Sequence, residues 1–125
     1  MRASFAILKI YLEVIMNFND YQKQAKATST IDPNGITAPY YFALGLNGEA
    51  GEIAEKLKKI IRNHDNDISK LDVDDFKKEL GDVLWYVAMM SEQVGLTLED
   101  VANTNLAKLA DRKARSVIKS TGDNR

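Results

Sequence analysis

Cysteine is absent from this sequence of 125 residues, and histidine, tryptophan and proline are scarce, with one, one and two copies. The absence of cysteine excludes a disulfide framework, a zinc–thiolate site and a thiol nucleophile, so we expect a cytoplasmic protein. A single histidine, His64, cannot supply the Glu-x-x-His pairs that carboxylate-bridged di-iron bundles place on two helices. We interpret His64 as a structural residue near a helix end.

An excess of charge of one sign is also missing, because 17 basic and 18 acidic side chains leave a net charge of -1. This balance provides no general field for DNA, RNA or an anionic membrane, so we expect no such partner. The apolar N-terminal stretch is interrupted by Lys9 and Glu13, is too short to span a membrane, and lacks a small-residue cleavage site. Because Met16 is a second plausible start, we expect residues 1–15 to be an N-terminal extension of one domain at residues 16–125.

Long alternating runs of polar and apolar residues, which would indicate strands, do not occur, and the pattern instead predicts an all-α fold. We expect a four-helix bundle-like protomer with helices at about residues 18–28, 39–63, 72–95 and 97–117. Pro39 suits the first turn of the second helix. Asp72 or Asp74 should cap the third helix, and Gly95 should end it. Thr97 should cap the fourth helix.

Acidic residues of the second and third helices stand among apolar neighbours. The second helix carries an apolar stripe of Phe42, Leu46, Ile53, Leu57 and Ile60. On a helical wheel, Glu49 falls in or beside this stripe and Glu52 lies at its edge. In the third helix, Asp82 is the only charged residue between positions 80 and 90, and Glu79 precedes it by one turn. An ionised carboxylate in such surroundings costs several kcal/mol unless a cation compensates it.

Two carboxylate pairs at spacing i, i+3 therefore predict a divalent metal site formed by Glu49, Glu52, Glu79 and Asp82. Magnesium is the expected ion, with manganese as a possible substitute, because magnesium prefers hard oxygen ligands. A bound metal can polarise a phosphoryl oxygen and activate water, and a nearby carboxylate can accept the proton. Glu52 and Glu55 are the candidate catalytic residues, although Glu55 could instead be an exposed charge paired with a neighbouring lysine.

The segments GLNGEAGEIAEKLKK and ELGDVLWYVA, with 26 residues between Glu52 and Glu79, resemble the ExxE and ExxD motifs of MazG-like nucleotide pyrophosphohydrolases. These enzymes belong to the all-α NTP pyrophosphatase superfamily, and the likeness covers residues 17–125. The resemblance implies an intertwined homodimer, sometimes paired into a homotetramer, with magnesium between the second and third helices. It also implies hydrolysis of a nucleoside or deoxynucleoside triphosphate at the α-β phosphate junction, to the monophosphate and pyrophosphate.

Candidate substrate contacts come from the third and fourth helices. The resemblance places Asn105 and Lys108 in a region that helps relatives to hold substrate, and Arg112 continues that face. The alternative is a polar outer surface. Trp85 could stack on a base, or it could pack in the core or in a dimer interface.

Other functions remain compatible with the same residues. Phosphoribosyl-ATP pyrophosphatase and dimeric dUTPase share the metal chemistry and differ in the base pocket. A non-catalytic helical dimerisation module would carry the acidic residues only as surface charges. The sequence does not identify the nucleotide.

Overall fold

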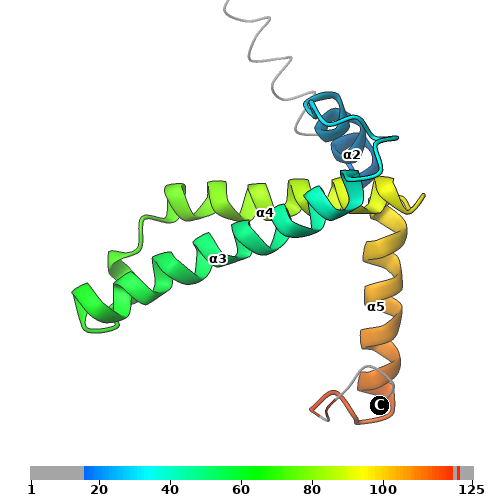
Figure 1. Cartoon of the computed structure of the whole chain (residues 1–125). Coiled ribbons are helices and arrows are strands. Elements are labelled where there is room, and N and C mark those ends of the chain that lie inside the picture. The colour runs from blue at the N-terminus through cyan, green and yellow to red at the C-terminus, as the bar shows by residue number, and fades with distance from the viewer. Residues whose placement is uncertain (1–15, 120, 122–125) are drawn as a thin grey trace, which may run out of the picture.

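The computed structural model describes residues 16–119 and residue 121, and within these residues it contains helices and no strand (Figure 1). Helix α2 spans Phe18–Ala27, α3 Ala38–His64, α4 Val73–Gln93 and α5 Leu98–Ala114, and a short 3-10 helix, η1, spans Ile68–Lys70. These four α-helices confirm the all-α prediction, with ends close to the expected residues. The short η1 was not predicted. The expected N-terminal extension, residues 1–15, lies outside the described residues.

Side-chain caps define where three of these helices begin. A side-chain oxygen accepts a first-turn backbone N–H in each case: Asn17 from Asp20 at 2.9 Å, Asp72 from Asp75 at 3.0 Å and Thr97 from Asp100 at 3.1 Å. These bonds satisfy donors that have no partner inside the helix. Asp72 is therefore the cap of α4, and Asp74 is not. Gly95, in the turn after α4, has φ 72°, a left-handed conformation that glycine adopts without strain.

The long helices α3 and α4 run antiparallel and side by side as a hairpin, and α2 and α5 meet at one end of it (Figure 1). Helix α2 packs against both α4 and α5, whereas α5 projects away from the hairpin and does not pack along α3. The described protomer is therefore more open than the bundle-like arrangement expected from the sequence.

The core lies where α2 and the loop after it cover the α3–α4 hairpin. Its buried members are Ala25, Ala38, Phe42, Ala88, Met89 and Leu98. Gln22, with only 4% of its surface exposed, connects α2 to the α4–α5 turn. Its amide donates to the carbonyl of Leu96 at 3.0 Å, and its oxygen accepts the N–H of Leu98 at 2.6 Å. Because the first bond is partly and the second fully shielded from water, they fix the start of α5 relative to α2.

The predicted apolar stripe of α3 is buried only in part within the protomer. Phe42 and Ile60 are buried, whereas Leu57 is 36% exposed. Several large apolar side chains of the three longest helices are about half exposed or more: Tyr40, Leu44, Ile61, Val73, Leu80 and Leu106. Among the described residues, no helix combines the length and the apolar character needed to cross a membrane.

Candidate metal centre

The α3–α4 hairpin brings three of the four predicted ligands together. Glu49 of α3 meets Glu79 and Asp82 of α4, and one carboxylate oxygen of each lies within 4.8 Å of the others. Glu79 and Asp82 can both face α3 because they lie one turn apart on the same side of α4. Glu49 and Glu79 are half-buried and Asp82 is exposed, so this group of three carboxylates is open to solvent on one side.

Negative charge at this group is only partly compensated by the protein. Burial raises the pKa of Glu49, and the charges of Asp82, Glu79 and Glu52 raise it further. A carboxyl group whose pKa rises beside other carboxylates lacks enough positive charge or hydrogen-bond donors around it. Glu52 is exposed and close enough to affect Glu49, but its oxygens do not join the group of three.

The donor set fits a hard divalent cation. All three donors are carboxylate oxygens, the ligand type that magnesium prefers. Two oxygens on opposite sides of a magnesium ion lie about 4.2 Å apart, because each bond is about 2.1 Å long. The three oxygens lie within 4.8 Å of one another, which is on the scale of this span, so side-chain rotations could bring all three to one ion. The remaining coordination positions are then available to water and phosphate oxygens.

Lys56 of α3 also contacts this group, a contact that sequence reasoning missed. Its Nζ lies 3.1 Å from Oε1 of Glu79 and forms a second ion pair with Asp75. Hydrogen bonds to Asp75 and Glu79 hold the pKa of Lys56 above its ordinary value. Lys56 follows Glu52 by one turn, so the sequence itself indicates that the two side chains share a face of α3.

Aromatic side chains also lie beside the three carboxylates. The ring of Tyr86 lies directly over Gly45, so close that an added Cβ at Gly45 would be 2.1 Å from its Cε1 atom. Burial raises the pKa of Tyr86, and a hydrogen bond with Tyr41 and the charges of Glu49 and Asp82 raise it further. Tyr86 is therefore a neighbour of the candidate centre that the sequence analysis did not identify, although it follows Asp82 by one turn.

The structure places Glu55 apart from the three carboxylates. Its carboxylate forms an ion pair with Lys58 and lies 3.8 Å from the Nζ of Lys59, both on the same helix. The hydrogen bond from Lys58 holds the pKa of Glu55 below its usual range. A carboxylate held in this way is a weaker proton acceptor than one beside other acids.

Trp85 is used for packing between helices. Its indole N–H donates to Oγ1 of Thr28 at 2.8 Å and to the carbonyl of Ala25 at 3.2 Å. Its ring packs edge-on against Phe42 and Tyr86, with ring centroids 5.9 and 4.9 Å away. These contacts favour the structural interpretation of Trp85.

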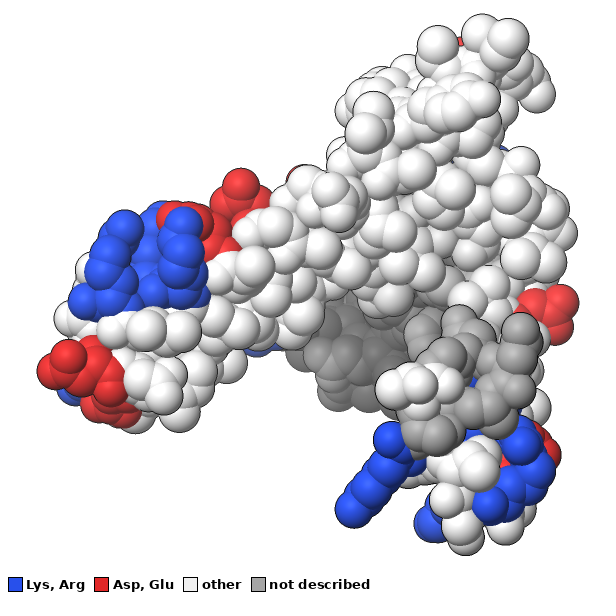
Figure 2. Space-filling view, turned by 60° about the horizontal axis from the view of Figure 1, so that its bottom comes forward, with Lys and Arg blue, Asp and Glu red and all other residues white. Residues whose placement is uncertain are grey.

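The proposed substrate contacts of α5 lie away from the carboxylates in the described protomer. Asn105 and Lys108 are exposed and Arg112 is buried, on a helix that projects from the hairpin (Figure 1). Figure 2 shows Lys and Arg side chains gathered at the tip of the hairpin and near the end of α5. Within the described protomer, α5 therefore does not bring these three residues to the carboxylates.

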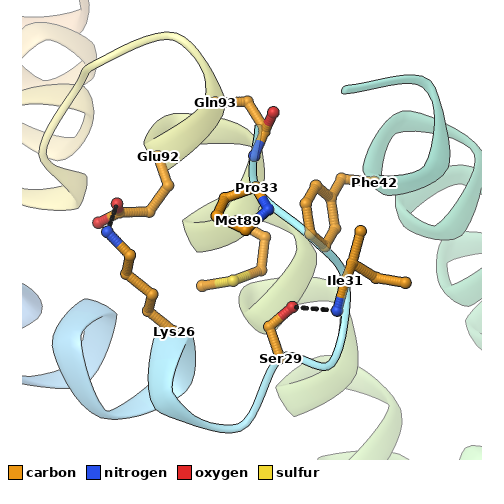
Figure 3. Close-up of a pocket in the computed structure, with 8 residues that line it drawn as sticks. All are labelled: Lys26, Ser29, Ile31, Pro33, Phe42, Met89, Glu92 and Gln93. Atoms are coloured by element: carbon orange, nitrogen blue, oxygen red, sulfur yellow. Dashed lines mark hydrogen bonds and ion pairs between the residues drawn. The ribbon is translucent and has the colours of Figure 1, made fainter. Parts of the chain in front are cut away.

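A small pocket of about 130 Å³ lies where α2 and its following loop cover the hairpin (Figure 3). It is lined by Lys26, Ser29, Ile31, Pro33, Phe42, Met89, Glu92 and Gln93. The Lys26 Nζ and a Glu92 oxygen pair at 2.7 Å at its edge. None of the predicted site residues lines this pocket, so it is separate from the candidate metal centre.

Comparisons with known proteins identify the family of most of the described chain. Residues 39–117, which run from the second residue of α3 to beyond the end of α5, match the family model described as the MazG nucleotide pyrophosphohydrolase domain. The chain is also 45% identical over 114 residues to the Gene 37 protein of Mycobacterium phage L5, a match covering 88% of this chain and all of that protein. No solved structure matches the chain.

Proposed function

The chain belongs to the MazG nucleotide pyrophosphohydrolase family, and we propose that it hydrolyses a nucleoside or deoxynucleoside triphosphate to the monophosphate and pyrophosphate in a magnesium-dependent reaction. The observation that supports this proposal is the meeting of Glu49, Glu79 and Asp82 across the α3–α4 hairpin. Three carboxylates whose negative charge is only partly compensated, on two helices packed together, suit a metal that also contacts phosphate.

The proposed reaction assigns a role to each acid near the centre. Magnesium held by Glu49, Glu79 and Asp82 would neutralise phosphate oxygens and lower the pKa of an attacking water. The water oxygen forms a bond to the α-phosphorus, and the bond between this phosphorus and the oxygen leading to the β-phosphate breaks. Glu52, next to the group but not part of it, accepts the water's proton. Glu55 is the weaker candidate base because Lys58 lowers its pKa.

Pyrophosphate release from a panel of nucleotides, with and without magnesium, tests this function. The panel includes dUTP and phosphoribosyl-ATP, so that the two related activities are measured with the same protein. Asp82→Asn keeps the shape of the side chain and removes its charge, and it should abolish most turnover while the fold survives. Asp74→Asn is the matched control, because the Asp74 side chain is 89% exposed and pairs with Lys77 of the same helix. Full activity of Asp82→Asn, or activity without any divalent metal, would contradict the proposal.

The active form is proposed to be a homodimer or homotetramer. The protomer leaves large apolar side chains of α3, α4 and α5 exposed, among them Leu44 at 74%, Leu80 at 49% and Leu106 at 64%. Exposed apolar faces of this extent are typical of association surfaces. Packing of α5 against the hairpin of a second copy would also bring Asn105, Lys108 and Arg112 towards its substrate. Light scattering during size-exclusion chromatography measures the oligomeric state directly. An active enzyme that is strictly monomeric would contradict the proposed homodimer or homotetramer.

A further inference from the structure

One lysine of α3 contacts the group of three carboxylates through Glu79. Lys56 follows Glu49 by seven residues, which is two helical turns, so both side chains can face α4. Asp75 precedes Glu79 by one turn and faces α3 in the same way. The Nζ of Lys56 contacts both acids and lies 3.1 Å from Oε1 of Glu79.

This contact differs from an ordinary surface ion pair. The side chains of Lys56 and Glu79 are 24% and 18% exposed, whereas those of Lys77 and Asp74, paired within α4, are 74% and 89% exposed. Ion pairs that are largely exposed contribute little, because solvent screens them and the side chains lose rotamer freedom. Lys56 joins two different helices in a less solvated place, so its contact can restrict the rotamer of Glu79.

We infer that Lys56 is a positioning residue for the metal centre: it holds one oxygen of Glu79, keeping this carboxylate beside Glu49 and Asp82. Asp75 anchors the ammonium group from the other side and limits its movement along the helix. Carboxylates that bind metals are commonly held by such outer partners, whose loss weakens metal binding by about 10–100-fold. This inference rests on the magnesium site of the proposed function.

The positive charge of Lys56 and its positioning of Glu79 have opposite effects on magnesium binding, so a single measurement can separate them. A positive charge close to a divalent cation repels it, so removal of the charge alone should tighten magnesium binding. Loss of the positioning contact should instead weaken binding, because Glu79 is then free to adopt rotamers outside the group. The sign of the change in magnesium affinity therefore distinguishes the two effects.

Isothermal titration of the full chain with magnesium chloride, without nucleotide, measures this affinity at fixed pH and ionic strength. Lys56→Met keeps most of the length of the side chain and removes the donor, and it should raise the Kd for magnesium by about 10–100-fold. Lys56→Arg keeps a charged donor and should recover most of the loss. Lys77→Met removes the same charge from an exposed position of α4 and should leave the Kd unchanged.

An unchanged or lower Kd in Lys56→Met would overturn the inference and leave the proposed function intact. If Lys56→Met does not fold, Asp75→Asn replaces it, with Asp74→Asn as the control, because both variants remove one negative charge from the first turn of α4 and only Asp75→Asn removes the anchor of Lys56. Asp75→Asn should weaken binding more than Asp74→Asn does, and equal Kd values for these two variants would equally overturn the inference. A wild-type protein that binds no magnesium would overturn both the inference and the proposed metal dependence.

Discussion

Replacing Gly45 by alanine should displace Tyr86 from its place beside the three carboxylates. The new Cβ would lie 2.1, 2.4 and 2.8 Å from the Cε1, Cζ and Cδ1 atoms of the Tyr86 ring. Carbon atoms in contact prefer separations of about 3.5–4.0 Å, so the ring must move by roughly 1.4 Å or more. The ring packs against Trp85 and Phe42, with centroids 4.9 and 6.4 Å away, so this movement disturbs both contacts.

The expected cost follows from two opposing effects. Forcing an extra methyl group into a filled space typically costs about 1–3 kcal/mol, whereas alanine is favoured over glycine inside a helix by about 1 kcal/mol. Gly48 lies one turn further along α3, and an added Cβ there would meet nothing within 4 Å. Gly48→Ala should therefore stabilise the protein by about 1 kcal/mol, through helix propensity alone. Because this effect is common to both changes, Gly45→Ala should be about 1–3 kcal/mol less stable than Gly48→Ala.

Urea unfolding followed by circular dichroism, without metal and at one protein concentration, measures this difference. The clash is tested independently by repeating Gly45→Ala in a Tyr86→Ala background, where the ring is absent and alanine should stabilise by about 1 kcal/mol. If Gly45→Ala is as stable as Gly48→Ala in the wild-type background, the ring of Tyr86 does not lie over Gly45 in the way described.

Two further changes test the electrostatics and the packing around the centre. The pKa of Glu49 is raised in the folded state above its ordinary 4.5, so the folded protein binds this proton more tightly than the unfolded chain. The contribution of Glu49 to the stability of the metal-free protein should therefore fall as pH rises from this ordinary value through the raised pKa. Urea midpoints of the wild type and of Glu49→Gln, measured at several pH values, isolate this contribution as the difference between the two proteins. Trp85→Phe loses the hydrogen bonds to Thr28 and Ala25 and should lower the free energy of unfolding by about 1 kcal/mol, while magnesium affinity stays unchanged. A large loss of magnesium binding in Trp85→Phe would contradict the structural role given to this residue.

The individual helices could be predicted because their signals are local. Thr97 and Asp72 cap helices through bonds to residues three positions away, and Gly95 ends α4 through its own backbone preference. The direction of α5 could not be predicted in the same way. It depends on Gln22, which bonds to Leu96 and Leu98 more than 70 positions further along the chain. Nothing in the pattern around Gln22 distinguishes it from an exposed polar residue of α2.

The carboxylates could be predicted because helical spacing and an apolar setting are both visible in the sequence. Glu49 was the most informative, and the structure places it half-buried against α4. Glu52 follows it by three residues, or about 300° of helical rotation, so it points some 60° away from Glu49 and stays exposed. The contacts of Lys56 and Tyr86 could not be predicted, because they depend on how far α3 is shifted along α4, and no local rule determines this register.

The charges around the centre also constrain the order in which its ligands can bind. Glu49, Glu79 and Asp82 contribute three negative charges, and Glu52 lies close enough to add to their field. Lys56 supplies one positive charge, and it shares that charge with Asp75. A triphosphate is itself strongly anionic, so this surface repels it in the absence of a cation. The proposed nucleotide therefore binds with magnesium or after it, and the protein's own basic residues near the centre cannot replace the metal.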